Sequence, residues 1–166
     1  LLEANVGNML RYDMTYDRQT DKNIRDNVGW LDFTHAITFA NAARQTCDKY
    51  PELWPQTLLQ MACFSGRNDA YTDHGLDDDQ WRVDDADDFF DSGVDGLFDH
   101  GRDEYIVSVH YVKTLLAARE EIRSGAAGAA TDTVLASLNR LVNSPLTLKH
   151  VRRTAHQAME FVILDG

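Results

Sequence analysis

Hydrophobic residues recur at helical spacing along most of the chain, and the longest such stretch runs from residue 27 to residue 47. Its apolar side chains form two rows, with Phe33, Ile37, Ala40 and Cys47 in the first and Leu31, Phe39 and Ala42 in the second. Two apolar rows on one helix predict burial on more than one side, so we expect a central helix. His35 lies in the second row, where burial of an ionisable ring requires a polar partner.

The same spacing predicts further helices over residues 1–11, 55–66, 102–123, 131–143 and 147–164. We expect Asp21, Thr131 and Thr147 to cap three of the helices, because side-chain oxygens accept hydrogen bonds from the first free N–H groups. The side chains expected to face the core are Leu58, Leu59, Met61, Ala62 and Phe64 in one helix and Ile106, Val109, Val112, Leu116 and Ala117 in another. No stretch alternates β-branched with polar residues. The sequence therefore predicts an all-α protein, a helical bundle of about six helices.

The two longest predicted helices share a common spacing of aromatic, histidine and arginine residues. The matched positions are Trp30, His35 and Arg44 in one helix and Tyr105, His110 and Arg119 in the other. An internal duplication would place the two histidines opposite each other about a pseudo-two-fold axis. Chance similarity between two amphipathic helices is the alternative, and both remain open at this point.

The length of 166 residues favours a single helical domain spanning 1–166. The chain opens on Leu1, so a fragment of a longer protein stays open beside a complete domain. No run of 18 apolar residues and no charged-then-apolar leader occurs, so we expect no membrane span and no secretion signal. Two cysteines, Cys47 and Cys63, make no disulfide framework, and we expect reduced, buried thiols in a cytoplasmic protein.

The net charge of −11 is concentrated in one segment of the chain. Residues 69–104 contain thirteen Asp and one Glu against two Arg, a balance of −12, and the remainder of the chain is at +1. A chain with this charge is not attracted to nucleic acid or to anionic membranes, so neither is an expected partner. The segment also carries many aromatic residues, which indicates that it is ordered, at least over residues 86–98.

Three histidines in the middle of separate predicted helices are the strongest candidates for chemistry. Inward-facing imidazoles with carboxylates near by are typical of non-haem transition-metal sites, with iron among the metals that suit them. The expected metal ligands are His35, His110 and His156, with Asp32, Asp103 and Glu160 as further ligands or as hydrogen-bond partners of the rings. The simpler alternative is that each histidine is a packing residue with one hydrogen bond. The Glu-x-x-His pairs of ferritin-like di-iron bundles are absent from the sequence.

The acidic segment contains a partial match to a calcium-binding loop between Asp91 and Asp99. Gly93 occupies a ligand position, however, and Arg102 stands where the loop requires Glu. We therefore favour an acidic face exposed to solvent. The chain also lacks a nucleophile elbow and a Gly-rich phosphate loop that follows a strand, so neither nucleophilic nor dinucleotide chemistry is expected.

The segment Gly29-Trp-Leu-Asp-Phe-Thr-His-Ala-Ile-Thr-Phe-Ala-Asn-Ala-Ala-Arg44 resembles a helix in the helical part of some bacterial proteins that also carry a Rieske iron–sulfur domain. The resemblance extends over residues 54–68 and covers well under half of the chain. It transfers no residue roles. The chain has no Cys-x-His pair to hold a Rieske cluster, so the resemblance implies the partner domain of such a protein and a redox setting.

Two hypotheses of different classes follow. In the first, the chain is a helical domain with a buried His/carboxylate metal site, a non-haem iron oxidoreductase or the partner of an iron–sulfur protein. In the second, it is a non-catalytic interaction or dimerisation domain whose histidines are packing residues. The expected partners are accordingly a second copy of the chain or a fused or separate redox domain. Whether the chain is an enzyme is left undecided by its residues.

Overall fold

The structure, a computed structural model, describes residues 1–17, 28–98, 105–144 and 159. Over these residues it contains no strand beyond one isolated bridge between Tyr12 and Thr72. The helices of this part of the chain are α1 (Leu2–Leu10), α2 (Met14–Asp17), α3 (Trp30–Cys47), α4 (Trp54–Asp69), α5 (Ala86–Phe98), α6 (Tyr105–Arg123) and α7 (Thr131–Asn143). Short 3-10 turns precede α4, α5 and α7, at Pro51–Leu53, Asp78–Trp81 and Gly128–Ala130. The predicted all-α helical bundle is confirmed.

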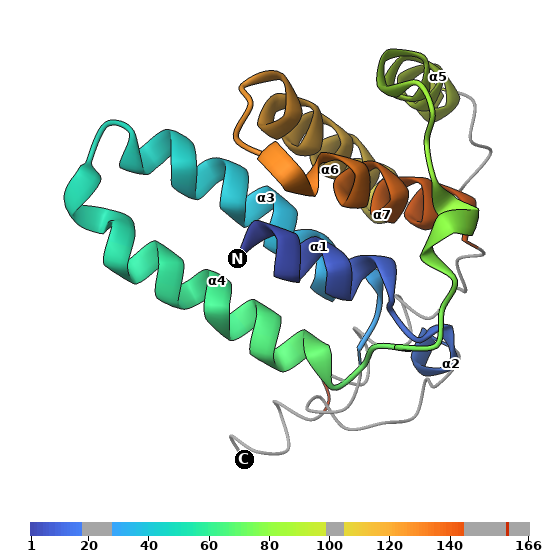
Figure 1. Cartoon of the computed structure of the whole chain (residues 1–166), viewed down its shortest axis with the longest axis horizontal. Helices are drawn as coiled ribbons and strands as arrows, with labels where there is room; N and C mark the ends of the chain where they lie inside the picture. The colour runs from blue at the N-terminus through green and yellow to red at the C-terminus, as the bar shows by residue number, and fades with distance from the viewer. Residues whose placement is uncertain (18–27, 99–104, 145–158, 160–166) are drawn as a thin grey trace.

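Helix α1 lies at the centre of the bundle and packs against α3, α4 and α7 (Figure 1). Helix α3 packs in addition against α4 on one side and α6 on the other, while α5 packs on the outer side of α6. This arrangement makes α3 a shared surface between two neighbours, as its two apolar rows predict. Among the described helices, none combines the length and the apolar content that crossing a membrane requires.

The core is built around an aromatic cluster at the beginning of α3. The ring of Tyr12 lies with its centroid 5.0 Å from that of Trp30 and 4.7 Å from that of Phe33. Arg140 of α7 is buried beside this cluster, donates a hydrogen bond to the Leu10 carbonyl oxygen and lies 5.5 Å over the Trp30 ring. Burial lowers the pKa of Arg140 from its ordinary value. A guanidinium in this place joins α7 to α1 and α3.

Helix α3 begins at Trp30, because the preceding glycine is extended and a carboxylate closes the first turn. Gly29 has φ −148°, and its N–H donates to Asp32 Oδ2 at 2.8 Å. The prediction that Asp21 caps this helix is wrong, because the N-cap of α3 is Gly29. Thr131 was expected to cap the helix over residues 131–143, and this prediction is wrong. Thr131 is the first residue of α7, and its hydroxyl donates to the Gly128 carbonyl oxygen at 2.9 Å. Thr147 and the predicted helix 147–164 lie outside the described residues.

The predicted inward face of α6 is largely wrong. Val109, Val112 and Leu116 are 55%, 39% and 52% exposed. The buried face is instead formed by Val107, Tyr111, Thr114, Leu115 and Ala118, together with the expected Ala117. Both faces of this helix are apolar, and the Tyr111 face packs on α7, where its hydroxyl donates to the Leu141 carbonyl oxygen at 3.2 Å. In α4, likewise, Met61 is buried whereas Leu58, Leu59 and Ala62 are exposed.

The acidic segment is ordered where the sequence predicts order, since residues 86–98 form α5. Phe90 is buried, whereas Asp87, Asp88, Asp91 and Asp95 are exposed. These carboxylates therefore lie on a solvent-exposed face, as expected. Their position within a helix excludes a calcium-binding loop at this point in the chain, because such a loop supplies its ligands from a non-helical turn.

Candidate functional site

Two of the three histidines expected to bind a metal lie next to each other. Helices α3 and α6 run parallel, with His35 beside His110 near their beginnings and Arg44 beside Glu121 near their ends (Figure 1). The two imidazole rings are in edge-to-face contact, with centroids 5.7 Å apart and planes at 76°. The facing histidines predicted from the common spacing are thus confirmed. Two parallel helices of the same pitch keep equal sequence offsets at the same height.

The histidine pair is accessible to solvent, which differs from the buried position that was expected. His35 is exposed and His110 is half-buried. The physical reason is that Phe33 and Ile37 are on the α3 face that enters the core, while His35 and Phe39 are on the face between α4 and α6. A ring on this face stays hydrated and does not need a buried partner.

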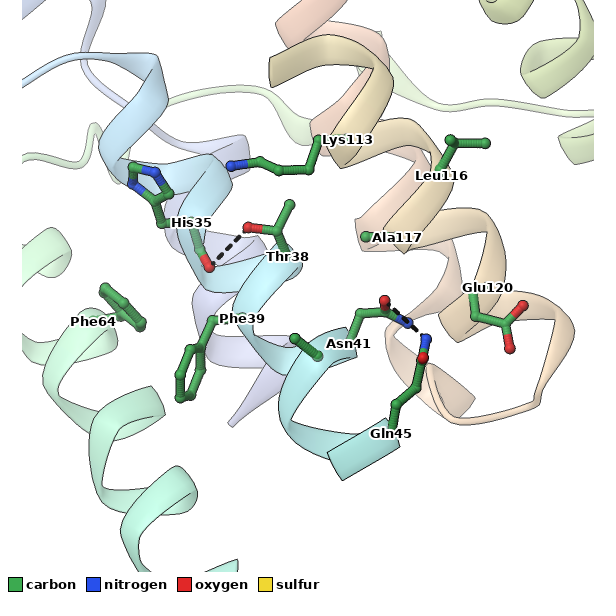
Figure 2. A pocket seen from close by; sticks show the side chains of 11 residues that line it. His35, Thr38, Phe39, Asn41, Gln45, Phe64, Lys113, Leu116, Ala117 and Glu120 are labelled. Atoms are coloured by element: carbon green, nitrogen blue, oxygen red, sulfur yellow. Dashed lines mark hydrogen bonds between the residues drawn. The ribbon is translucent and has the colours of Figure 1, made fainter. Parts of the chain in front are cut away.

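A groove with a volume of about 1020 Å³ runs along this face of α3 (Figure 2). His35 and Phe39 belong to its α3 floor, Phe64 to its α4 wall, and Lys113 and Leu116 to its α6 wall. The rings of Phe39 and Phe64 meet edge to face with centroids 5.6 Å apart, so one side of the groove is aromatic. Sequence reasoning missed this groove, although His35, Phe39 and Ala42 follow one another at helical spacing.

Lys113 is the cation of the groove. Figure 2 shows its side chain extending from α6 toward His35. Desolvation by burial lowers the pKa of Lys113 from its ordinary value. Within the part of the chain that the structure describes, no carboxylate forms an ion pair with this amine. Lys113 is not recognisable as a site residue from the sequence, since a lysine within a helix is usually a solvated surface residue.

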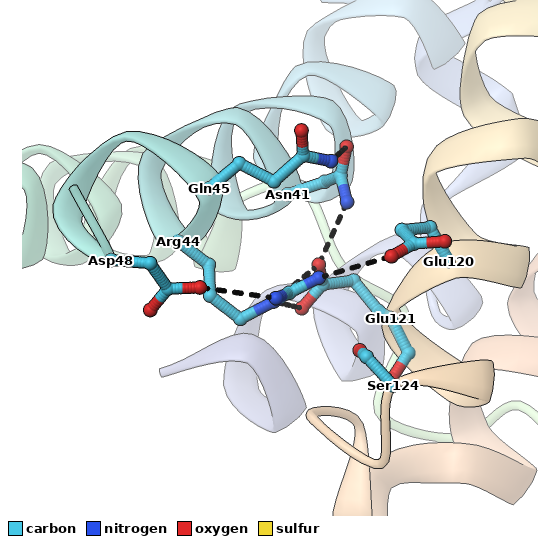
Figure 3. Close-up of polar contacts among 7 residues, drawn as sticks. All are labelled: Asn41, Arg44, Gln45, Asp48, Glu120, Glu121 and Ser124. Carbon is cyan, nitrogen blue, oxygen red and sulfur yellow. Dashed lines mark hydrogen bonds and ion pairs between the residues drawn. The ribbon is translucent and has the colours of Figure 1, made fainter.

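A buried carboxylate lies beside Asn41, one of the residues that line the groove (Figure 3). Glu121, whose side chain is 4% exposed, accepts hydrogen bonds from Asn41 Nδ2 at 2.8 Å and from Arg44 Nε at 2.9 Å. Arg44 also lies 3.5 Å from Asp48 and 3.8 Å from Glu120. A charge buried with this many partners is satisfied, so the cluster joins α3 to α6 and is not a free catalytic acid.

The remaining expected ligands do not join the histidine pair within the described residues. Asp32 Oδ2 accepts the Gly29 N–H, and Oδ1 lies 3.4 Å from Arg67 of α4. This carboxylate therefore fixes the beginning of α3. His156, Asp103 and Glu160 lie outside the described residues. Across residues 1–17, 28–98, 105–144 and 159, no group of three or more His, Cys, Asp or Glu side chains has the arrangement that holds a metal ion.

The cysteines do not contribute to the site. Cys47 is buried at the end of α3, where its Sγ lies 3.4 Å from Thr57 Oγ1. Cys63 is exposed on α4, so the expectation of two buried thiols is wrong for this residue. Helix α4 buries only its Met61 and Asn68 side, and Cys63 lies on the other side.

The centroid separation of the two imidazoles, 5.7 Å, is short enough for a shared ligand, and their edge-to-face contact is equally typical of packed aromatic rings. Metal–nitrogen distances of about 2.1 Å place the ring centroids of two histidines on one metal roughly 5 to 6 Å apart. The observed separation of 5.7 Å falls in this range. Imidazole nitrogens bind zinc, copper, iron and nickel, and the open groove leaves room for further ligands beside the pair.

Comparisons of the chain with protein-family models, with curated proteins and with solved structures find no match. The functional argument therefore rests on the geometry of the groove and its histidines.

Proposed function

We propose that the chain binds a transition-metal ion, with iron as the leading candidate, at His35 and His110 and serves oxidoreductase chemistry there. The observation that supports this proposal is the meeting of two imidazoles from different helices at one end of an open groove. Two nitrogen ligands alone hold a divalent metal weakly, so the site needs at least one more protein ligand.

His156 is the proposed third nitrogen ligand, and Asp103 and Glu160 are the proposed carboxylate ligands or hydrogen-bond partners of the rings. Three protein ligands leave coordination positions open, as metal sites that act on a bound substrate require. The resemblance of residues 29–44 to the helical part of proteins with a Rieske domain supports a redox setting. In that setting the electron donor is a fused or separate iron–sulfur domain.

One observation favours a second function, that of an interaction or dimerisation domain. Val109, Val112 and Leu116 form an exposed apolar row along α6, beside the groove. Rows of this kind are typical of surfaces that bind another protein or a second copy of the same chain. In this alternative the two histidines are contact residues, and no metal is required.

Metal titration of chelator-treated protein tests the first proposal. Fe²⁺ under anaerobic conditions and Co²⁺ in air are added while heat and visible absorption are recorded. We expect one equivalent to bind, and we expect His35→Ala and His110→Ala each to weaken binding at least tenfold. His74→Ala is the matched control, because His74 is exposed and lies outside the groove.

Equal affinities of His35→Ala, His110→Ala and His74→Ala, in protein shown to be folded by circular dichroism, would overturn the metal proposal. His156→Ala tests the third ligand separately, since unchanged affinity in this variant removes only that assignment. Light scattering tests the alternative: Leu116→Asp should then convert an oligomer to a monomer, and a wild-type protein that is monomeric rules out dimerisation.

A further inference from the structure

We propose that the groove between α3, α4 and α6 is a binding site for a small organic anion with an apolar, aromatic body, in which Lys113 pairs with the anionic group. The ligand's role as a substrate rests on the proposed metal centre at the same end of the groove. The binding of the ligand does not depend on that metal centre, because Lys113 and the apolar walls need no metal.

Within the part of the chain that the structure describes, the charge at Lys113 is available to a ligand. No carboxylate among the described residues forms an ion pair with its amine. Glu120, the carboxylate among the described residues that line the groove, lies 3.8 Å from Arg44. An unpaired, partly desolvated cation gains more from an anion than an exposed lysine does, since water screens the exposed pair more strongly.

The walls on either side suit an aromatic or otherwise apolar body. Phe39 and Phe64 form an edge-to-face pair on one side, and Ala117 lies on the α6 side of the groove (Figure 2). Burial of apolar surface between such walls contributes about 25 cal/mol per Å². The groove volume of about 1020 Å³ is at the upper end of ordinary ligand sites, so a ligand of two or more fused rings fits within it.

The far end of the groove is polar and adds a preference for a hydrogen-bonding substituent. Gln45 Nε2 donates to Asn41 Oδ1 at 3.2 Å, and Asn41 in turn donates to the buried carboxylate of Glu121 (Figure 3). This chain of bonds fixes the Asn41 amide. The expected ligand therefore has an anionic group at one end, an apolar middle and a donor such as a hydroxyl group at the other.

The negative net charge of the chain predicts how the affinity for an anion depends on salt. A net charge of −11 repels anions at long range, so an anion binds this protein only where a local cation compensates. Salt screens the long-range repulsion more than the close contact with Lys113. Affinity for an anionic ligand should therefore rise, or stay constant, between low and moderate ionic strength.

Fluorescence titration of the metal-free protein with 2-naphthoate tests the proposal, and 2-naphthamide serves as the neutral probe of the same shape. We expect saturable binding of naphthoate that weakens at least tenfold in Lys113→Met. Lys49→Met, in an exposed lysine outside the groove, should change it less than twofold. Naphthamide should bind more weakly than naphthoate and should be unaffected by Lys113→Met.

A second pair of variants tests the location. Ala42→Trp places a bulky ring on the groove floor and should abolish binding of both probes, whereas Thr46→Trp, one turn further and outside the groove, should leave it intact. Both positions are exposed, so neither substitution disturbs the core. Equal naphthoate affinity in Lys113→Met and Lys49→Met, or equal affinity for the two probes, would overturn the proposal.

The pH dependence gives an independent readout. Among the described residues, the titratable side chains that line the groove with Lys113 are His35 on α3 and Glu120 on α6, and His110 is in ring contact with His35. Burial lowers the pKa of Lys113 below 10.5, the ordinary pKa of a lysine. The amine therefore loses its charge at a lower pH than an exposed lysine does. Naphthoate binding should fall over the alkaline range in wild type and stay flat in Lys113→Met. The His110→Ala variant, at a proposed metal ligand that does not line the groove, should still bind naphthoate, which separates this inference from the metal proposal.

Discussion

Removal of the Glu121 carboxylate should destabilise the protein far more than removal of the neighbouring Glu120 carboxylate. The Glu121 side chain is 4% exposed and the Glu120 side chain 53% exposed, although both contact the same guanidinium. In Glu121→Ala, Arg44 keeps only its longer contacts, at 3.5 Å to Asp48 and 3.8 Å to Glu120, and Asn41 loses its acceptor. A buried pair broken on one side costs about 3 kcal/mol.

The expected cost for Glu120→Ala is below about 0.5 kcal/mol, because an exposed ion pair is screened by water. Urea unfolding followed by circular dichroism measures both variants. For a chain of this length, about 3 kcal/mol corresponds to a fall in melting temperature of roughly 6 to 12 °C. If the free energies of unfolding of the two variants differ by less than about 1 kcal/mol, the cluster does not join α3 to α6 as described.

Three further predictions concern the core, the buried arginine and the thiols. Leu138→Ala should lower the free energy of unfolding by about 3 kcal/mol because Leu138 is fully buried. Leu59→Ala, at an exposed site, should change it by less than about 0.5 kcal/mol. Similar urea midpoints of the two variants would contradict the prediction. Arg140→Ala should cost about 2 kcal/mol by the same assay, because it removes a buried charge-assisted hydrogen bond, and a cost near zero would mean that the bond does not stabilise the fold. Cys63 should react at once with an aromatic disulfide reagent and Cys47 only on unfolding, so two rapidly labelled thiols per folded chain would refute the assigned exposure.

The helices were predictable because their apolar spacing is regular over many turns, and all of α1, α3, α4, α6 and α7 correspond to predicted segments. The facing direction was not predictable for α6. Its Tyr111 and Leu115 face and its Val112 and Leu116 face are both apolar, and only the packing of α7 decides which one enters the core. The local spacing of apolar residues does not determine which of the two faces of α6 is buried.

The candidate site was predictable in part for the same reason. The equal offsets of His35 and His110 along two long helices predicted opposite positions for the two rings if the helices were duplicated about a pseudo-two-fold axis, and the rings are in contact. The role of Lys113 was not visible, since a groove depends on which helix leaves its neighbour uncovered. Nor was the pairing of Arg44 with Glu121, because 77 positions separate these residues in the sequence.

Two ion pairs fasten α3 near its opposite ends, one from Asp32 to Arg67 of α4 and one from Arg44 to Glu121 of α6. Apart from Asn41, which donates to Glu121, the side chains between them that line the groove take no part in these attachments. Substitutions on that stretch can therefore change what the groove accepts at little cost in folding. Because, apart from Asn41, different residues anchor α3 and line the groove, the groove face of α3 is a suitable place for substitutions that change ligand selectivity, including those sought by directed evolution.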